Sequence, residues 1–235
     1  MALEDFTTYD ETDPDNVITV GANSLSFNDF RGRFTTSHIA DDKGVNHFSG
    51  DFEHKFEIEF SDSTKLALTG HWMVANSYAV DKDLADMISG GEDCQIFHYY
   101  HADDVPLVYN LTLQIIEDGS QDVDTWVSPV ASTRYFIRVN RDDDGGANNT
   151  GQINVYIATD NYDDEGGTLK DTLTRDCGVG KQNDFRYIYP LYSYDTDNNV
   201  SNDGYTENLD LQEEAPPVGN AGIMTPNTGF WGPTF

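Results

Sequence analysis

Acidic side chains gather in two loop-like stretches of the sequence and could bind a metal ion. The first, residues 140–145, starts like a calcium-binding loop, with Asp142 and Asp144 as ligands. The twelfth position of such a loop requires a bidentate Glu, and here that position is Gly151. The second stretch has four carboxylates in residues 160–165. The alternative to a metal site is that both stretches are solvent-exposed acidic loops without a bound ion. The candidate ligands of one weakly bound Ca²⁺ are Asp160, Asp163, Asp164, Asp142 and Asp144.

The histidines do not form a zinc-binding pattern. His98 and His101 lie three residues apart in a stretch that we expect to be a strand. Successive side chains of a strand point to opposite faces, so this odd spacing separates the two rings. Nucleophile elbows, phosphate-binding loops and CxxC motifs are absent from the sequence.

Aromatic side chains beside hydrogen-bonding residues could bind a sugar. The chain has 13 Tyr, 13 Phe and 3 Trp, a composition that also favours strands over helices. Aromatic residues of a sandwich more often lie in its core, and a core position is the alternative for each candidate. The candidate sugar-binding residues are Tyr99, Tyr100, Trp126, Tyr192 and Tyr194.

The charge of the chain excludes two classes of partner. Forty-two acidic residues against 13 basic ones give a formal net charge of -29, which repels nucleic acids and anionic membranes. A solvated acidic surface explains this charge, and a salty medium, bound divalent cations or a basic partner are the alternatives. No apolar run reaches the roughly 20 residues of a membrane span, and the acidic amino terminus lacks the pattern of a secretory signal. We therefore expect synthesis in a cytoplasm.

The two cysteines, Cys94 and Cys177, are expected to be buried free thiols rather than a late-formed pair.

The stretch Asp51–Phe60 predicts the fold class. Its sequence, DFEHKFEIEF, alternates apolar and charged residues strictly, which fits a half-buried strand. Its apolar face needs a second layer of strands above it. Other stretches supply that layer, including a hairpin over Val17–Phe27 and a second hairpin formed by Arg134–Asn140 and Gln152–Ala158. We therefore predict an all-β antiparallel sandwich of the jelly-roll type, with ten or eleven strands.

Two further elements complete the expected architecture. The spacing of Leu84, Met87 and Ile88 predicts one short helix within Asp81–Ser89, covering an end of the sandwich. Pro190 lies within the expected strand Asp184–Tyr194 and predicts either an edge strand or a bulge there. The domain is expected to span residues 1–214, with residues 1–16 as an extended lead-in.

The last stretch, Ala215–Phe235, has no charged residue and contains four prolines, which exclude a regular helix or a central strand. Its apolar side chains could fold back over the sandwich or dock into a neighbouring subunit, since aromatic residues dominate binding hot spots. We predict an apolar carboxy-terminal arm. Its candidate assembly residues are Ile223, Met224, Phe230, Trp231 and Phe235.

The order of these segments resembles the concanavalin A-like lectin/glucanase superfamily, in particular its laminin-G-like branch. The segments that carry the resemblance are HFSGDFEHKFEIEF, LTGHWMVAN, RYFIRVNRD, INVYIATD, LKDTL, DFRYIY and GYTENLDL, within residues 15–212. Versions encoded by phages and environmental viruses are similar in their acidic amino terminus. The resemblance implies a lectin, a glycosidase, an adhesin or an inert virion part, and calcium is common in such lectins.

Laminarinase-type members of this superfamily carry a Glu-x-Asp-x-x-Glu strand with two catalytic glutamates. The resemblance places Glu57 at the nucleophile position, Glu59 at the Asp position and Asp62 at the second Glu position. Asp62 would point to the opposite face unless a bulge intervened, and Asp is one methylene too short for a retaining pair. A solvated acidic strand face is therefore the preferred interpretation of these residues.

We predict a non-enzymatic structural or accessory virion protein that decorates a capsid or builds an appendage. Its partners would be other copies of itself or capsid proteins, it would have no cofactor other than a candidate Ca²⁺, and it would reside in the virion. The first alternative is a soluble glycan-binding module, cytoplasmic or released by a non-classical route. The second is a laminarinase-like glycoside hydrolase.

Overall fold

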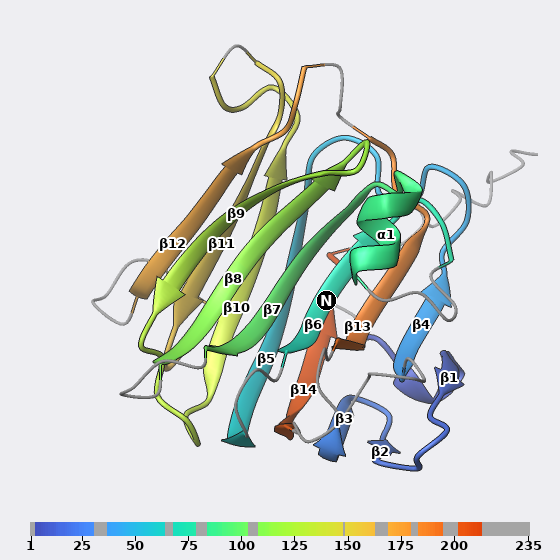
Figure 1. The fold of residues 1–235 in the computed structure, drawn as a ribbon, viewed down its shortest axis with the longest axis vertical. Coiled ribbons are helices and arrows are strands. Elements are labelled where there is room, and N and C mark those ends of the chain that lie inside the picture. The colour runs from blue at the N-terminus through green and yellow to red at the C-terminus, as the bar shows by residue number, and fades with distance from the viewer. Residues whose placement is uncertain are drawn as a thin grey trace, which may run out of the picture.

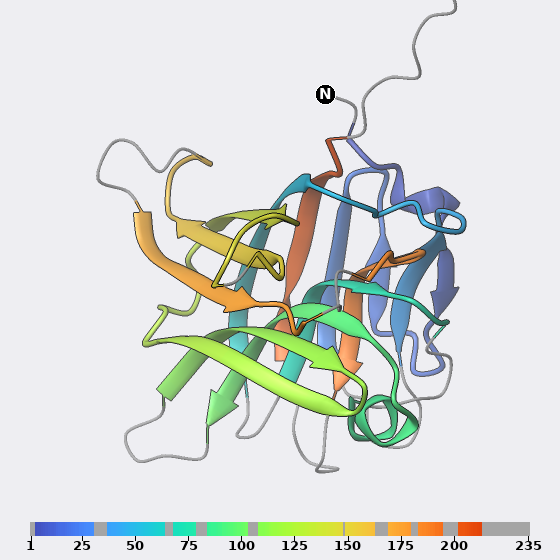
Figure 2. The same ribbon diagram turned by 90° about the horizontal axis from the view of Figure 1, so that it is seen from above.

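The computed structural model describes residues 3–30, 37–63, 68–78, 84–102, 108–147, 149–162, 169–179, 183–194 and 202–212. Two seven-stranded antiparallel sheets pack face to face in these segments (Figures 1 and 2). The protein is therefore an all-β sandwich, as predicted. The predicted domain boundary after residue 214 lies outside the described residues.

The first sheet, sheet A, faces the viewer in Figure 1. Its strands, in spatial order, are β1 (Asp10–Thr12), β4 (His38–Asp42), β13 (Tyr187–Tyr194), β6 (Leu68–Ala75), β7 (Cys94–Ala102), β8 (Val108–Glu117) and β9 (Ser120–Val127).

The second sheet, sheet B, lies behind it. Its strands, in spatial order, are β12 (Leu169–Asp176), β11 (Gln152–Ala158), β10 (Tyr135–Asp142), β5 (Phe52–Ser63), β14 (Asn202–Asp210), β3 (Ser24–Phe30) and β2 (Ile18–Val20). A short 3₁₀ turn, Phe6–Thr8, precedes β1.

The core lies between the two sheets, and β5 is central to it. Phe56, Ile58 and Phe60 of this strand are at most 1% exposed, because inward-facing residues of sheet A cover them. The ring of Phe60 stacks on Tyr99 of β7 with 4.3 Å between the centroids. The glutamates between them point away from the core. The predicted alternation of this strand is confirmed.

The helix α1 (Leu84–Gly90) covers part of the outer face of sheet A, so the prediction that it covers an end of the sandwich is wrong (Figure 1). Its Met87 is buried in a second apolar cluster with Met73 and Ile96, which point outward from β6 and β7. Sheet A therefore has apolar residues on both faces wherever the helix lies over it. No helix among the described residues is long and apolar enough to cross a membrane.

Pro190 lies in β13, which is a central strand between β4 and β6. The register between β13 and β4 shifts between Ile188 and Leu191, so the bulge alternative is confirmed and the edge alternative is wrong. The bulge removes the need for a ladder hydrogen bond at the proline. It also lets Ile188 and Leu191 enter the main core while Tyr189 joins the cluster beneath α1.

Three strands were not predicted, namely β1, β4 and β9. Strand β9 lies at the edge of sheet A, next to β12 at the edge of sheet B. Arg175 of β12 bridges these edges, with its Nε 3.1 Å from Asp122 and its Nη1 3.8 Å from Asp124. Asp124 also accepts a hydrogen bond from the backbone N–H of Thr174 at 2.9 Å. Side chains, rather than a shared ladder, therefore close this side of the sandwich.

Both cysteines are free and buried, as expected. Burial raises the pKa of Cys177 to about 11, and it raises the pKa of Cys94 further. Both thiols are therefore protonated and unreactive at neutral pH.

Candidate functional site

A groove on the outer face of sheet A has the features of a binding site, and we call it the sheet A groove. It lies where α1 no longer covers the sheet, and its cavity volume is about 640 Å³. This volume is within the range of about 300–1,000 Å³ that is typical of small-molecule sites. Its lining residues are Leu68, His98, Tyr100, Thr112, Gln114, Gln121, Asp122, Val123 and Thr125.

Strand register brings these residues together. His98 of β7 is paired with Thr112 of β8, and Thr112 is paired with Thr125 of β9. Alternate residues of β8 enter the core, so the polar residues between them point outward. On β6 the register shifts between Gly70 and Trp72, which places Trp72 in the core and Leu68 at the margin of the groove.

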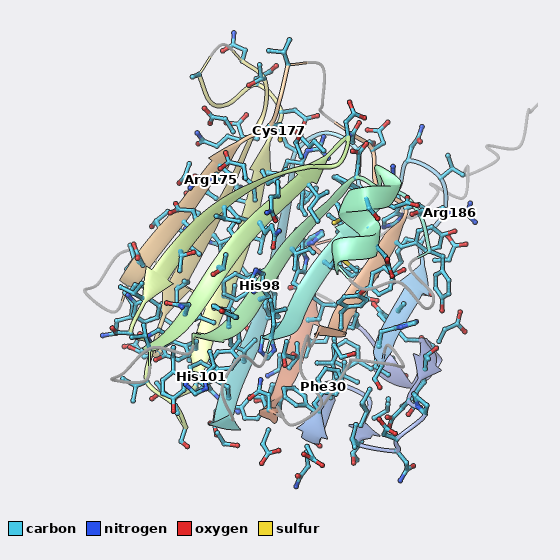
Figure 3. All side chains as sticks on the ribbon, viewed as in Figure 1. Phe30, His98, His101, Arg175, Cys177 and Arg186 are labelled. Carbon is cyan, nitrogen blue, oxygen red and sulfur yellow. The ribbon has the colours of Figure 1, made fainter. Side chains whose placement is uncertain are left out.

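His98 lies midway along sheet A and is 5% exposed (Figure 3). Neither of its ring nitrogens completes a hydrogen bond of normal geometry with the protein. Burial lowers the pKa of His98 to about 4, and the nearby backbone of Tyr99 and side chain of Gln114 only partly oppose this effect. The ring is therefore neutral at physiological pH, and it presents one N–H donor and one nitrogen acceptor.

Two hydrogen bonds link the strands along the groove. The Gln114 amide donates from Nε2 to Oε1 of Gln121 at 2.8 Å, and the hydroxyls of Thr112 and Thr125 are 3.1 Å apart. Each amide has two donor and two acceptor positions, so this pairing leaves hydrogen-bonding capacity for a ligand. The pairing also fixes the side-chain rotamers, which lowers the entropy cost of binding.

The sheet A groove is almost uncharged, although the chain has a net charge of -29. Asp122 is the only Asp, Glu, Lys or Arg among the lining residues that the structure describes. The carboxylate of Asp122 is 68% exposed and lies 3.1 Å from the Arg175 guanidinium, at the margin of the groove. A ligand in the groove would therefore meet neutral donors and acceptors.

A second cavity of about 530 Å³ lies on the outer face of sheet B. The Glu57 carboxylate, in a residue that is 7% exposed, lies at its base. It accepts hydrogen bonds from Asn208 Nδ2 at 3.0 Å and from the Tyr162 hydroxyl at 3.2 Å, and Arg134 Nη1 is 2.9 Å from its other oxygen. Burial and the Glu57 charge raise the pKa of Tyr162, which keeps its hydroxyl protonated as a donor. The lining residues are Leu3, Lys55, Glu57, Asn161, Tyr162, Asn208 and Asp210.

No protein-family model and no curated protein matches the sequence. Solved structures do match the fold. A functionally unknown protein from Saccharomyces cerevisiae is 10% identical with a TM-score of 0.56, and the match covers 90% of this chain and 100% of that one. A legume lectin-like domain from Entamoeba histolytica is 12% identical with a TM-score of 0.55, covering 86% of this chain and 88% of that one. An alginate lyase from Pseudomonas aeruginosa is 9% identical with a TM-score of 0.55, covering 89% of this chain and 100% of that one.

The fold is that of the concanavalin A-like lectins and glucanases. Identities of this size show the fold alone. The two characterised neighbours named here differ in activity, so function has to be argued from the sites of this concanavalin A-like sandwich.

Of the residues placed by the laminarinase comparison, Glu57 and Glu59 lie on the outer face of sheet B. Glu57 is held by the three donors described above. Glu59 accepts a hydrogen bond from the Tyr205 hydroxyl at 3.3 Å. The side chain of Asp62 lies outside the described residues.

Of the predicted sugar-binding aromatics, Tyr100 lines the sheet A groove. Tyr99 and Tyr192 are at most 1% exposed, and Trp126 packs edge-on against the ring of Tyr135 with 5.7 Å between centroids. The side chain of Tyr194 lies outside the described residues.

Of the predicted calcium ligands, Asp142 accepts a hydrogen bond from the backbone N–H of Asp144 at 3.1 Å, within a turn. Asp144 and Asp160 are exposed, and Asp163 and Asp164 lie outside the described residues. In the part of the chain that the structure describes, no three His, Cys, Asp or Glu side chains are placed to hold a metal ion. The predicted assembly residues Ile223, Met224, Phe230, Trp231 and Phe235 also lie outside the described residues.

Most residues of the sheet A groove were not predicted as a site. A signal was available in β8, where Thr112 and Gln114 alternate with apolar residues in the run LTLQII. A strand of a sandwich that carries uncharged hydrogen-bonding residues on its outward face is suited to a polar ligand. The position of His98 opposite Thr112, however, depends on strand pairing that the sequence does not display.

Proposed function

We propose that this protein is a non-enzymatic carbohydrate-binding protein and that the sheet A groove is its sugar site. The observation that carries the proposal is a nearly uncharged groove in which His98, Gln114 and Gln121 offer both donors and acceptors. Each sugar hydroxyl both donates and accepts hydrogen bonds, so side chains of this kind match it. The ring of Tyr100 adds apolar surface, which suits the C–H face of a sugar.

The chemistry of the groove supports binding without turnover. Glycoside hydrolysis uses two carboxyl groups on either side of the scissile bond, about 5–5.5 Å or 6.5–9.5 Å apart. Among the lining residues that the structure describes, the groove has one carboxyl group, that of Asp122, which is paired with Arg175. A lyase that acts on a uronate polymer has to bind a polyanion, and no Lys or Arg is among the described lining residues.

A glycan array tests this proposal. We expect the protein to bind one class of glycan equally with calcium and with EDTA, because the described lining residues of the groove include no cluster of metal ligands. The variant Gln114→Ala should lose at least about tenfold in affinity, since it removes a ligand contact and the partner of Gln121. Gln152→Ala on sheet B is the matched control and should bind normally. Absence of binding to every glycan, or release of cleaved sugar products, would refute the proposal.

We also propose, from the sequence, that the uncharged arm Ala215–Phe235 attaches the sandwich to a virion. Under this proposal the protein is related to the phage-encoded, laminin-G-like proteins that its sequence resembles, and it resides in the virion. It is compatible with sugar binding, because a virion appendage can recognise surface glycans. It is supported by 21 consecutive residues without charge in a chain of net charge -29.

Truncation after Glu214 tests this second proposal, with light scattering as the measurement. We expect the full chain to form an oligomer and the truncated chain to be a folded monomer that still binds the same glycan. The same number of subunits for both forms would argue against an assembly role for the arm.

A further inference from the structure

We infer that the sheet A groove selects an uncharged glycan of at least two sugar units and that His98 is the residue that recognises it. This inference rests on the carbohydrate-binding function proposed above and names the ligand class of the same site. It depends on the charge of the groove, on the incomplete hydrogen bonds of the His98 ring and on the arrangement of the polar residues across the strands.

Charge selects the class of glycan. A carboxylate or sulfate group only accepts hydrogen bonds, and proteins usually bind it with Arg or Lys. The described lining residues of the groove include neither, and the one charged side chain among them is Asp122. The net charge of -29 further disfavours an anionic polymer. A cationic ligand would find the one described carboxylate of the groove, that of Asp122, already in contact with Arg175.

His98 is the groove residue whose buried polar atoms most need a hydrogen-bonding partner from a ligand. Its side chain is more than nine-tenths buried and lines the groove, and neither ring nitrogen has completed its hydrogen bond with the protein. Buried polar groups are nearly always hydrogen-bonded in native proteins, so a hydroxyl at this position would complete the pattern. A ligand without that hydroxyl would leave the imidazole unpaired, which makes His98 a specificity-determining residue.

Strand spacing sets the minimum length of the ligand. His98, Thr112 and Thr125 lie side by side on three neighbouring strands. Strands are about 4.8 Å apart, so this row extends over about 10 Å across the sheet. That length exceeds a single pyranose ring. The pair Gln114 and Gln121 lies beside the row on the same face, so a ligand of two or more units contacts both sets of groups.

Titration calorimetry with two His98 variants tests this inference. The ligands are neutral gluco-, manno- and galacto-oligosaccharides of one to four units, together with uronate and sulfated oligosaccharides of the same lengths. We expect binding to neutral chains, an increase in affinity from one unit to two, and no binding to the anionic set. His98→Phe keeps a planar ring without hydrogen bonds and should weaken binding about 10- to 100-fold. His98→Gln keeps a neutral donor and acceptor and should stay within about threefold of the wild type.

The control is His47→Phe, the same substitution at an exposed histidine outside the groove, and it should leave affinity unchanged. Thermal unfolding of each variant shows whether it is folded. Tighter binding of an anionic chain, or normal binding by His98→Phe, would overturn this inference while leaving carbohydrate binding intact. No binding to any member of either set would overturn both.

Discussion

Three buried histidines predict that acid unfolds this protein well above the pH at which most carboxylates are protonated. Burial lowers the pKa of His54 and His71 to about 3 and that of His98 to about 4, against an ordinary value of 6.5. Nδ1 of His54 accepts a hydrogen bond from the Trp72 indole at 3.0 Å, and Nδ1 of His71 is 2.8 Å from the Thr206 hydroxyl. All three rings are therefore neutral in the folded state. In the unfolded chain they become protonated below about pH 6.5.

The sign of the effect follows from proton counting. Between about pH 6.5 and pH 4 the unfolded state binds more protons than the folded state, so stability falls as pH falls through this window. Within this window one histidine lowers the free energy of unfolding by about 1.4 kcal/mol for each unit by which the pH falls, so three histidines lower it by about 4 kcal/mol per unit. From about pH 6.5 to about pH 4.5 the loss approaches 8 kcal/mol, which is similar to the whole free energy of unfolding of a typical domain. Reduced repulsion among the carboxylates offsets part of this loss.

Urea unfolding followed by tryptophan fluorescence measures the effect, because the buried Trp72 lies against His54. We expect the free energy of unfolding to decrease steeply below about pH 6, with a slope of about three protons. The variant His54→Gln keeps a hydrogen-bond acceptor for Trp72 and should reduce that slope by one proton. A free energy that is flat or rising from about pH 6.5 to 4.5 would refute the reasoning, and so would an unchanged slope in His54→Gln.

Three further outcomes can be measured on purified protein. Arg141→Leu should destabilise the fold by about 3 kcal/mol in urea unfolding, because this guanidinium is fully buried and donates to Asp143 at 2.6 Å. Gly204→Ala should lower the melting temperature by more than about 10 °C, because a Cβ there would lie 2.1 Å from the Glu59 carbonyl oxygen. Cys94 and Cys177 should react with a thiol reagent only after denaturation, because both are buried and protonated; rapid labelling of the native protein would contradict this.

The fold could be predicted from the sequence where one face of a strand is apolar throughout. The stretch Asp51–Phe60 and the hairpin of β10 and β11 are of this kind, and in both the pattern alone determines which side chains are buried. Strand β9 lacks such a pattern, because Asp122 and Asp124 alternate with Val123 and Thr125. Those aspartates are stabilised by Arg175, a residue about 50 positions later in the chain. Their role depends on a tertiary contact that no local pattern displays.

The candidate site was harder to predict because it depends on shifts in register. The bulge between Gly70 and Trp72 changes which residues of β6 point outward, so Leu68 lines the groove although the alternation of the strand assigns it to the core face with Trp72 and Val74. The candidate aromatics were chosen by type and proximity in sequence, and the alternation of side chains along β7 separates Tyr100 in the groove from Tyr99 in the core. Residue type therefore indicated a class of ligand, whereas strand pairing determined which side chains can reach it.

The outer face of sheet A explains why the groove lies where it does. On β7, Ile96 and His98 point to the same side two residues apart, but Ile96 is covered by the cluster beneath α1 and His98 lines the groove. On β7 the apolar outward residue lies beneath the helix and the polar one lies in the groove, where Leu68 and Val123 of the neighbouring strands add two apolar side chains. A face left open without a function could be solvated by Lys or Glu, as at the partly exposed Glu53, Lys55 and Glu59 of β5 on sheet B, and would not need a buried imidazole with incomplete hydrogen bonds. The change from apolar to neutral polar residues within one strand therefore supports a ligand rather than solvent as the partner of this surface.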